Sequence, residues 1–431
     1  MTGEAPTQPA TAWRWIPSLY FAQGIPYVIV MTVSVVMYKT LGISNTDIAL
    51  YTSWLYLPWV IKPIWSPLVD MFGTKRRWIL TLQLMIGASL ALVALTIPAS
   101  HFFQATLAVF WLMAFSSATH DIAADGYYML GLQQHQQAAF VGVRSAFYRL
   151  AMIAGQGGLV FAAGQLGEFT GNVAMAWTIV LLFAGAVFLA LYAWHRLALP
   201  VPAADQPTAA GSNIAQGFAE TFASFFARPG IASILAFLLL FRFAEAQALK
   251  LVTPFLLDPL ARGGLGLTTS QVGIVYGTVG VIALTIGGIL GGLAISRHGL
   301  RRWLWPMVFA MHVPNLVFVY LAFVQPQSAL LVAAALAIEQ FGYGFGFAAY
   351  LLFMIMVAEG SHKTAHYAIC TGFMALGMML PGMASGWIQE QLGYANFFVW
   401  VCFATLPAFI ATALVRVERD FGRKAPDPNP S

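Results

Sequence analysis

The stretch ATLAVFWLMAFSSATHDIAADGYYMLGL, residues 105–132, is apolar and long enough to cross a lipid bilayer. It nevertheless contains His120, Asp121 and Asp125. A carboxylate at membrane depth costs about 2.5–3.5 kcal/mol on insertion scales, so such residues normally face the interior of a helix bundle and have partners there. Asp121 and Asp125 are four residues apart and therefore share one face of a helix. The stretch predicts a membrane-spanning helix with a paired acidic face.

The composition of the whole chain is that of a membrane protein. Of its 431 residues, 59% are hydrophobic and 9% are charged, whereas soluble proteins average about 25% charged residues. The formal net charge of +5 does not predict nucleic-acid binding, because membrane proteins concentrate Lys and Arg in cytoplasmic loops. The cysteines Cys370 and Cys402 lie in apolar runs, which favours packing roles over a disulfide. We therefore expect contacts with the lipid bilayer and none with nucleic acid.

The sequence contains no pattern typical of an enzyme or of a cofactor site. There is no phosphate-binding loop, nucleophile elbow or zinc-ligand spacing. His120 and Asp121 are adjacent and point about 100° apart on a helix, so they do not converge on a metal. The run GGILGG at 287–292 indicates close packing of helices rather than nucleotide binding. We expect no cofactor, no metal and no enzymatic activity.

Apolar runs of membrane-spanning length predict an all-α membrane protein with twelve transmembrane helices in two pseudo-symmetric six-helix bundles. We expect the domains to be a tail at 1–12, a bundle at 13–197, a linker at 198–229, a bundle at 230–417 and a tail at 418–431. The helices are expected at about 13–38, 47–69, 78–98, 103–130, 138–164, 173–197, 230–257, 270–295, 303–324, 328–357, 365–389 and 395–416.

The distribution of basic residues predicts the orientation. If the N-terminus is cytoplasmic, the opposite loops carry only Lys39 and Arg262, and the remaining loop cations lie inside. Both termini are then cytoplasmic. The halves also repeat, because LGISNTDIA at 41–49 matches LGLTTSQVG at 265–273, which favours a duplicated six-helix unit.

The loop after the second expected helix is a candidate gate. The sequence SPLVDMFGTKRRW at 66–78 places Asp70 at a helix end, before Lys75, Arg76 and Arg77. A carboxylate there can bind a neighbouring helix terminus or arginine in one conformation and release it in another. The alternative is that the three cations act only as topology signals.

A second candidate gate lies inside the first bundle. At 1.5 Å per residue, Asp121 and Asp125 lie towards the cytoplasmic end of their helix, at depths that overlap those of Arg144 and Arg149 in the next helix. We expect an ion-pair cluster of these four residues. It could act as a gate or as a purely structural connection between the two helices.

Other polar residues at membrane depth are candidates for proton coupling and solute binding. Glu339 and Glu245 are expected near the midplane, where a carboxyl group can exchange a proton; Arg242 lies one turn before Glu245 and could pair with it. Both acids could instead have structural roles only. The candidates for contacts with an anionic solute, through charge, hydroxyl or aromatic groups, are Lys62, Gln23, Tyr27, Arg242 and Tyr343. Lys62 could instead pair with Asp121, or extend to the cytoplasmic interface.

Four local stretches carry a resemblance to a known family. They are Gly24-Ile25-Pro26, Lys62 with Trp65-Ser66-Pro67-Leu68 and Asp70, Phe115-Ser116 through Asp121-Ile122 and Asp125, and Tyr148-Arg149. With the two six-helix halves, the chain resembles the AmpG-like permeases of the major facilitator superfamily, a group related to the acetyl-CoA transporter family.

This resemblance implies a proton-driven importer in the bacterial inner membrane, multi-pass and working by alternating access. The cargo it implies is a glycan or muropeptide-like solute, anionic or zwitterionic, and we expect the protein to act as a monomer. A siderophore or another small anionic solute is the alternative within transport. A membrane acyltransferase or a sensor is the alternative outside transport, although the sequence has neither a catalytic constellation nor a signalling domain.

Overall fold

The computed structural model describes residues 9–203, 205–207, 214–360 and 363–423. The described residues form helices and loops and no β-strand. Their contacts divide the chain into two compact units, one with residues 1–41 and 61–212 and the other with residues 42–60 and 213–431. The fold class expected from the sequence, an all-α membrane protein, is confirmed. The domain boundaries expected from the sequence stay a prediction.

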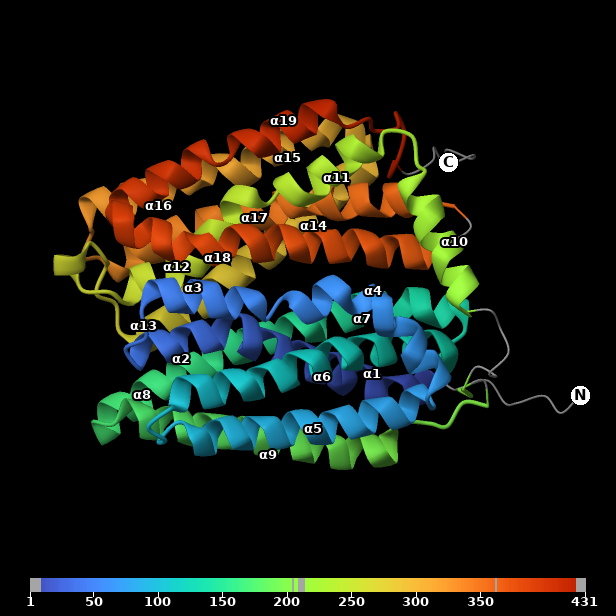
Figure 1. The fold of residues 1–431 in the computed structure, drawn as a ribbon, viewed down its shortest axis with the longest axis horizontal. Coiled ribbons are helices and arrows are strands. Elements are labelled where there is room, and N and C mark those ends of the chain that lie inside the picture. The colour runs from blue at the N-terminus through green and yellow to red at the C-terminus, as the bar shows by residue number, and fades with distance from the viewer. Residues whose placement is uncertain (1–8, 204, 208–213, 361–362, 424–431) are drawn as a thin grey trace, which may run out of the picture. The chain divides into compact units, whose positions relative to one another are not determined.

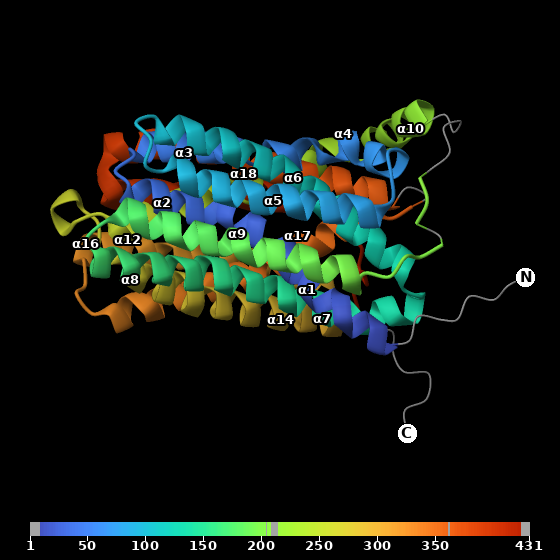
Figure 2. The same ribbon diagram turned by 90° about the horizontal axis from the view of Figure 1, so that it is seen from below.

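The first unit is built from long helices that pack side by side, such as α5 with α9 (Figure 1) and α1 with α7 (Figure 2). Its elements are α1 (Pro9–Val28), η1 (Ile29–Val33), α2 (Ser34–Thr40), the part of α4 (Leu57–Met71) that follows Val60, α5 (Lys75–Thr96), α6 (Phe102–Gly131), α7 (Gln134–Met152), η2 (Ile153–Leu159), α8 (Val160–Thr170) and α9 (Val173–Ala198).

The second unit contains the remaining helices. Its elements are α3 (Asn45–Trp54), the start of α4, α10 (Ile214–Phe226), α11 (Ile231–Leu240), α12 (Phe243–Leu257), η3 (Leu260–Arg262), α13 (Thr269–Val272), η4 (Gly273–Gly280), α14 (Val281–His298), α15 (Leu300–His312), η5 (Val313–Asn315), α16 (Leu316–Val324), α17 (Ala329–Ala358), α18 (Lys363–Phe403) and α19 (Leu406–Leu414). Helix α18 packs along both α3 and α12.

Ten helical runs in the described part of the chain are long and apolar enough to span a membrane. The last run, Ala365–Leu414, contains both of the final two expected helices, separated where Gly393 adopts φ 71° and ψ 166°. The expected helix at 47–69 is instead two shorter helices, α3 and α4. Pro58 lacks the N–H that would continue the hydrogen-bond ladder to Trp54, so the helix is interrupted there.

Glycines allow α14 and α17 to pack backbone against backbone, as the run at 287–292 predicts. A Cβ on Gly287 would lie 2.2 Å from the carbonyl oxygen of Phe341, and one on Gly344 would lie 2.0 Å from that of Leu284. Any side chain would therefore force the two helices apart. The prediction of close helix packing is confirmed.

Candidate functional site

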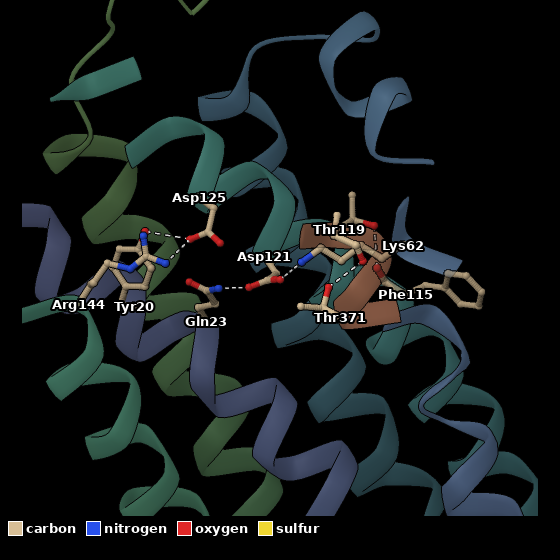
Figure 3. Close-up of polar contacts among 10 residues, drawn as sticks. Tyr20, Gln23, Lys62, Phe115, Thr119, Asp121, Asp125, Arg144 and Thr371 are labelled. Atoms are coloured by element: carbon tan, nitrogen blue, oxygen red, sulfur yellow. Dashed lines mark hydrogen bonds and ion pairs between the residues drawn. The ribbon is translucent and has the colours of Figure 1, made fainter. Parts of the chain in front are cut away.

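A charged group in the first unit centres on Asp121. Lys62 from α4 forms an ion pair with Oδ2 of Asp121, and Gln23 from α1 donates to its Oδ1 (Figure 3). The side chains of Lys62 and Asp121 are 21% and 23% exposed. Three helices thus meet at one carboxylate, which binds a cation and a neutral donor.

The second charged group of the same unit centres on Asp125, one turn further along α6. Arg144 from α7 donates to its Oδ1 at 3.0 Å, and the hydroxyl of Tyr20 donates to the same oxygen at 3.1 Å (Figure 3). The guanidinium carbon of Arg144 lies 4.5 Å from the ring centre of Tyr20 and 5.0 Å from that of Tyr128. Aromatic faces therefore stabilise a cation whose side chain is only partly exposed to water.

Two pairings that the sequence suggests are present in these groups. Asp125 binds Arg144 as expected, and Asp121 contacts Lys62 together with Gln23. The pairing of Asp121 with Arg149 stays a prediction. The gating role of these residues stays a prediction.

A third charged group lies in the second unit. Arg242 binds Glu245 with two hydrogen bonds, Nε to Oε2 at 3.1 Å and Nη2 to Oε1 at 2.8 Å. Arg242 also donates to the hydroxyl of Tyr343 on α17 at 2.7 Å and lies over the ring of Phe347. Both charged side chains are less than one-tenth exposed. The pairing of Arg242 with Glu245 that their spacing suggests is present, and Tyr343 belongs to the same group.

Glu339 on α17 is buried without an ion pair in the described part of the chain. Its residue is 4% exposed, and Oε2 accepts a hydrogen bond of 2.9 Å from the side-chain amide of Gln340. This surrounding differs from that of Glu245, whose charge is matched by Arg242. The proton-coupling roles assigned to the two acids stay predictions.

The remaining candidates lie apart from these groups or at their edge. Tyr27 is half-buried, with its ring 6.4 Å from that of Tyr148. At the start of α5, the backbone N–H groups of Lys75 and Arg76 donate to the carboxylate of Asp205 at 2.7 and 3.0 Å.

The candidate gate also includes Arg77 and Asp70. Arg77 is exposed. The side chain of Asp70 lies outside the part of the chain that the structure describes. Among the described residues, Asp205 brings a carboxylate to this turn.

Arg76 also holds the linker with its side chain. Its Nε donates to the carbonyl of Leu199 at 3.1 Å and its Nη2 to that of Arg196 at 2.6 Å. The side chain of Arg76 therefore has structural partners in addition to any effect on topology.

The reasoning from sequence missed a chain of buried polar side chains across α5, α6 and α9. Nδ1 of His195 lies 2.9 Å from Oε1 of Gln83, and Nε2 of Gln83 lies 3.1 Å from Nε2 of His120. Because an amide oxygen only accepts, His195 donates to Gln83, which in turn donates to His120. The signal was a set of isolated polar residues in apolar runs, which gave no pairing. His120 is thus a member of a hydrogen-bonded chain, and the described residues include no cluster of metal-ligand type.

Lys250 is the other residue to which the sequence gave no role. It lies in α12, is 4% exposed, and donates to the hydroxyl of Thr52 at 2.9 Å. Its Nζ also lies 5.2 Å from the ring centre of Tyr56. The only signal in the sequence was a lysine in an apolar run.

Comparison with known proteins gives a consistent set of relatives. The family model described as the Major Facilitator Superfamily matches residues 18–358. The chain is 25% identical over 419 residues to the anhydromuropeptide permease of Escherichia coli K12, covering 94% of this chain and 80% of that protein. It is 24% identical over 408 residues to a putative transporter, AmpG 4, of Rickettsia conorii, covering 90% of this chain and 93% of the relative.

Two solved structures share the fold at low sequence identity. One is a bacterial homologue of the human lysosomal transporter Spinster, with a TM-score of 0.70 at 15% identity, covering 95% of this chain and 96% of the other. The second is a D-xylose–proton symporter, with a TM-score of 0.71 at 12% identity, covering 97% of this chain and 99% of the other.

Proposed function

This chain belongs to the Major Facilitator Superfamily of membrane transporters, and we propose that it imports an anhydromuropeptide-like glycan across the bacterial inner membrane, driven by protons. The resemblance that the helix motifs carry is thereby confirmed at the level of the family and of its AmpG-like members. The protein is a multi-pass membrane transporter of a small-molecule solute and not an enzyme. The cargo is proposed from the relative in E. coli, whose similarity extends over 94% of this chain.

The observation that carries the proposal is the set of charged groups inside apolar helices of both units. Keeping a carboxylate or an ammonium group at membrane depth is costly, so such residues mark solute or ion paths. Lys62 is the most suitable of them for an anionic cargo. It binds Asp121 through a single contact, and a solute carboxylate can take the place of Asp121 on the ammonium group. Gln23 then still provides a donor for Asp121.

Proton coupling is assigned to Glu339 because of its partner. Its hydrogen bond comes from the neutral amide of Gln340, so Glu339 can bind and release a proton without leaving a buried cation unpaired. Protonation of Glu245 would instead leave Arg242 without its counter-charge, which is strongly unfavourable in a buried site. Glu245 is therefore assigned to holding Arg242 and Tyr343 in place.

Transport is proposed to follow alternating access, with the monomer as the working unit and both termini in the cytoplasm. The ion pairs Lys62–Asp121 and Arg144–Asp125 join α6 to α4 and to α7, so they are placed to break and re-form when these helices move. Their partial exposure, between 21% and 39% of each side chain, keeps the cost of that exchange moderate.

The test is uptake of a radiolabelled anhydromuropeptide by proteoliposomes that contain the purified chain. With an acidic outside, we expect the wild type to accumulate the probe. Glu339→Gln should lose this accumulation and retain counterflow, because the amide cannot exchange a proton. Glu168→Gln is the matched control, since Glu168 is an exposed acid at the end of α8, and it should behave as the wild type.

Two outcomes would contradict separate parts of the proposal. If Glu339→Gln accumulates the probe as the wild type does, Glu339 is not the proton carrier. If the wild type neither binds nor takes up the anhydromuropeptide, the assigned cargo is wrong.

A further inference from the structure

Lys250 is a buried cation in the second unit that no described carboxylate contacts. It is 4% exposed, and its hydrogen-bond partner is the hydroxyl of Thr52 at 2.9 Å. Thr52 in turn donates its own proton to the carbonyl oxygen of Ile48 at 2.6 Å. One N–H of Lys250 is therefore used by a neutral acceptor, and the ring of Tyr56 at 5.2 Å adds a second weak interaction.

Glu245 on the same helix and Glu339 on α17 have other partners. Glu245, five residues earlier on α12, binds Arg242 through both carboxylate oxygens. Glu339 accepts its hydrogen bond from Gln340. A buried ammonium group without an anion is strongly unfavourable. Binding of an anion from outside the chain to Lys250 would therefore be favourable.

A second, independent observation at the same place concerns Ser53. Its hydroxyl is fully buried and has no hydrogen-bond partner in the described part of the chain. Buried hydroxyl groups almost always have a partner. The hydroxyl and the stem of Lys250 lie against the same face of Gly382 on α18, where a Cβ would be 2.7 Å from Oγ of Ser53 and 3.4 Å from Cγ of Lys250. The glycine thus lets α18 approach closely to two groups with unused hydrogen-bonding capacity, so both groups lie at one place.

We propose that Lys250 and Ser53 bind a carboxylate of the transported solute. When no solute is bound, the hydroxyl of Thr52 accepts the hydrogen bond of the Lys250 ammonium group. The inference rests on the proposed function only in taking the chain to be a solute transporter. Lys250 supplies the positive charge, Ser53 supplies a hydroxyl donor, and the carboxylate replaces the hydroxyl of Thr52 on the ammonium group. α3, α12 and α18 each contribute one wall of this site.

The test compares binding of an anhydromuropeptide with binding of the same compound after its carboxylates are converted to carboxamides. We expect the wild type to prefer the carboxylate form by about tenfold to a hundredfold, the ratio expected for a charged hydrogen bond. Lys250→Met should reduce this ratio to near one. Arg262→Gln also removes one positive charge, but from an exposed loop position, and should leave the ratio unchanged.

Ser53→Ala keeps the inference testable if Lys250→Met does not fold. Its hydroxyl has no partner to lose, so the substitution should leave thermal stability of the empty protein unchanged or raised. It should nevertheless weaken binding of the carboxylate probe by about threefold to tenfold, because one neutral hydrogen bond is lost. A Ser53→Ala protein that binds the probe as tightly as the wild type would overturn the assignment of Ser53.

The outcomes separate this inference from the assigned cargo. If the wild type binds the anhydromuropeptide and Lys250→Met keeps the full preference for carboxylate, the Lys250 site is wrong and the cargo stands. If the wild type binds no anhydromuropeptide, the assigned cargo is wrong. The Lys250 site is then tested by comparing the rise in melting temperature caused by glucuronate with that caused by uncharged glucose. A rise with glucuronate that is lost in Lys250→Met supports the site, and no rise with glucuronate in the wild type overturns it.

Discussion

The ion pair between Lys62 and Asp121 allows the sharpest test of the charged groups. Lys62→Met removes the cation while retaining the length of the side chain, and leaves Asp121 with Gln23 as its remaining partner. Asp121→Asn removes the anion and leaves Lys62 without its counter-charge. The double variant removes both charges together, so neither side chain leaves an unpaired charge behind.

The structure sets the expected size of the effect. Removing one member of a fully buried ion pair costs about 3–5 kcal/mol, and exposed pairs contribute about 0–1 kcal/mol. The side chains of Lys62 and Asp121 are 21% and 23% exposed, which places the pair between these limits. We expect each single substitution to cost about 2 kcal/mol and the double variant to cost about the same. The coupling free energy is then about 2 kcal/mol.

The assay is the free energy of unfolding of the purified protein in mixed detergent micelles, measured for the four members of the cycle. Arg423 and Asp420 form the control pair, at 3.6 Å with side chains 56% and 73% exposed, and should show a coupling below about 0.5 kcal/mol. A coupling for Lys62 and Asp121 as small as that of the control pair would refute the reasoning, because it would mean that the contact does not hold α4 to α6.

Three further substitutions test other parts of the structure. Gly344→Ala should destabilise the protein by about 1–3 kcal/mol through overpacking, since a Cβ there would lie 2.0 Å from the carbonyl oxygen of Leu284. Gly292→Ala, with nothing within 4 Å, should be close to neutral in the same unfolding measurement. Gln83→Leu should lower the free energy of unfolding by about 2–4 kcal/mol because it leaves buried nitrogens of His120 and His195 without partners. Ser89→Ala is the control and should leave the free energy of unfolding unchanged, since its buried hydroxyl has no partner to lose. Equal losses in the two variants would contradict the hydrogen-bonded chain of His195, Gln83 and His120. Asp205→Asn should weaken the start of α5 by about 1 kcal/mol, seen as faster proteolysis of the 198–229 linker; an unchanged cleavage rate would argue against that contact.

Apolar length and local chemistry made much of the fold predictable. The membrane-spanning runs, the close helix packing at the glycines of 287–292 and the family resemblance follow from residues that are close together in the sequence, whereas α17 as the packing partner does not. The interruption at Pro58 was also readable in principle, because proline cannot donate a backbone hydrogen bond. Its consequence for α3, which packs with α18 in the second unit, was not, because that depends on contacts distant in sequence.

The charged residues of the site could be named from the sequence, but which of them form ion pairs could be predicted only in part. Depth along the bilayer correctly brought Asp125 to Arg144, and one-turn spacing correctly suggested Arg242 with Glu245. Whether Lys62 meets a solute or Asp121 was left open, because the answer depends on the rotation of α4 and α6 about their axes, which a count of residues from the helix end does not determine.

Lys250 and Ser53 are the converse case. Within the described chain, Lys250 has a neutral hydroxyl and no carboxylate as its partner, and the hydroxyl of Ser53 has no hydrogen-bond partner. Such an absence becomes visible only in three dimensions.

The central claim is that a proton gradient drives import of an anhydromuropeptide-like solute through this chain. It is tested most directly by following a radiolabelled anhydromuropeptide in proteoliposomes with an acidic outside, with and without a protonophore. We expect the internal concentration to rise above the external one and to fall back to it when the protonophore collapses the gradient. Accumulation that the protonophore leaves unchanged, or entry that never exceeds the external concentration, would contradict the claim.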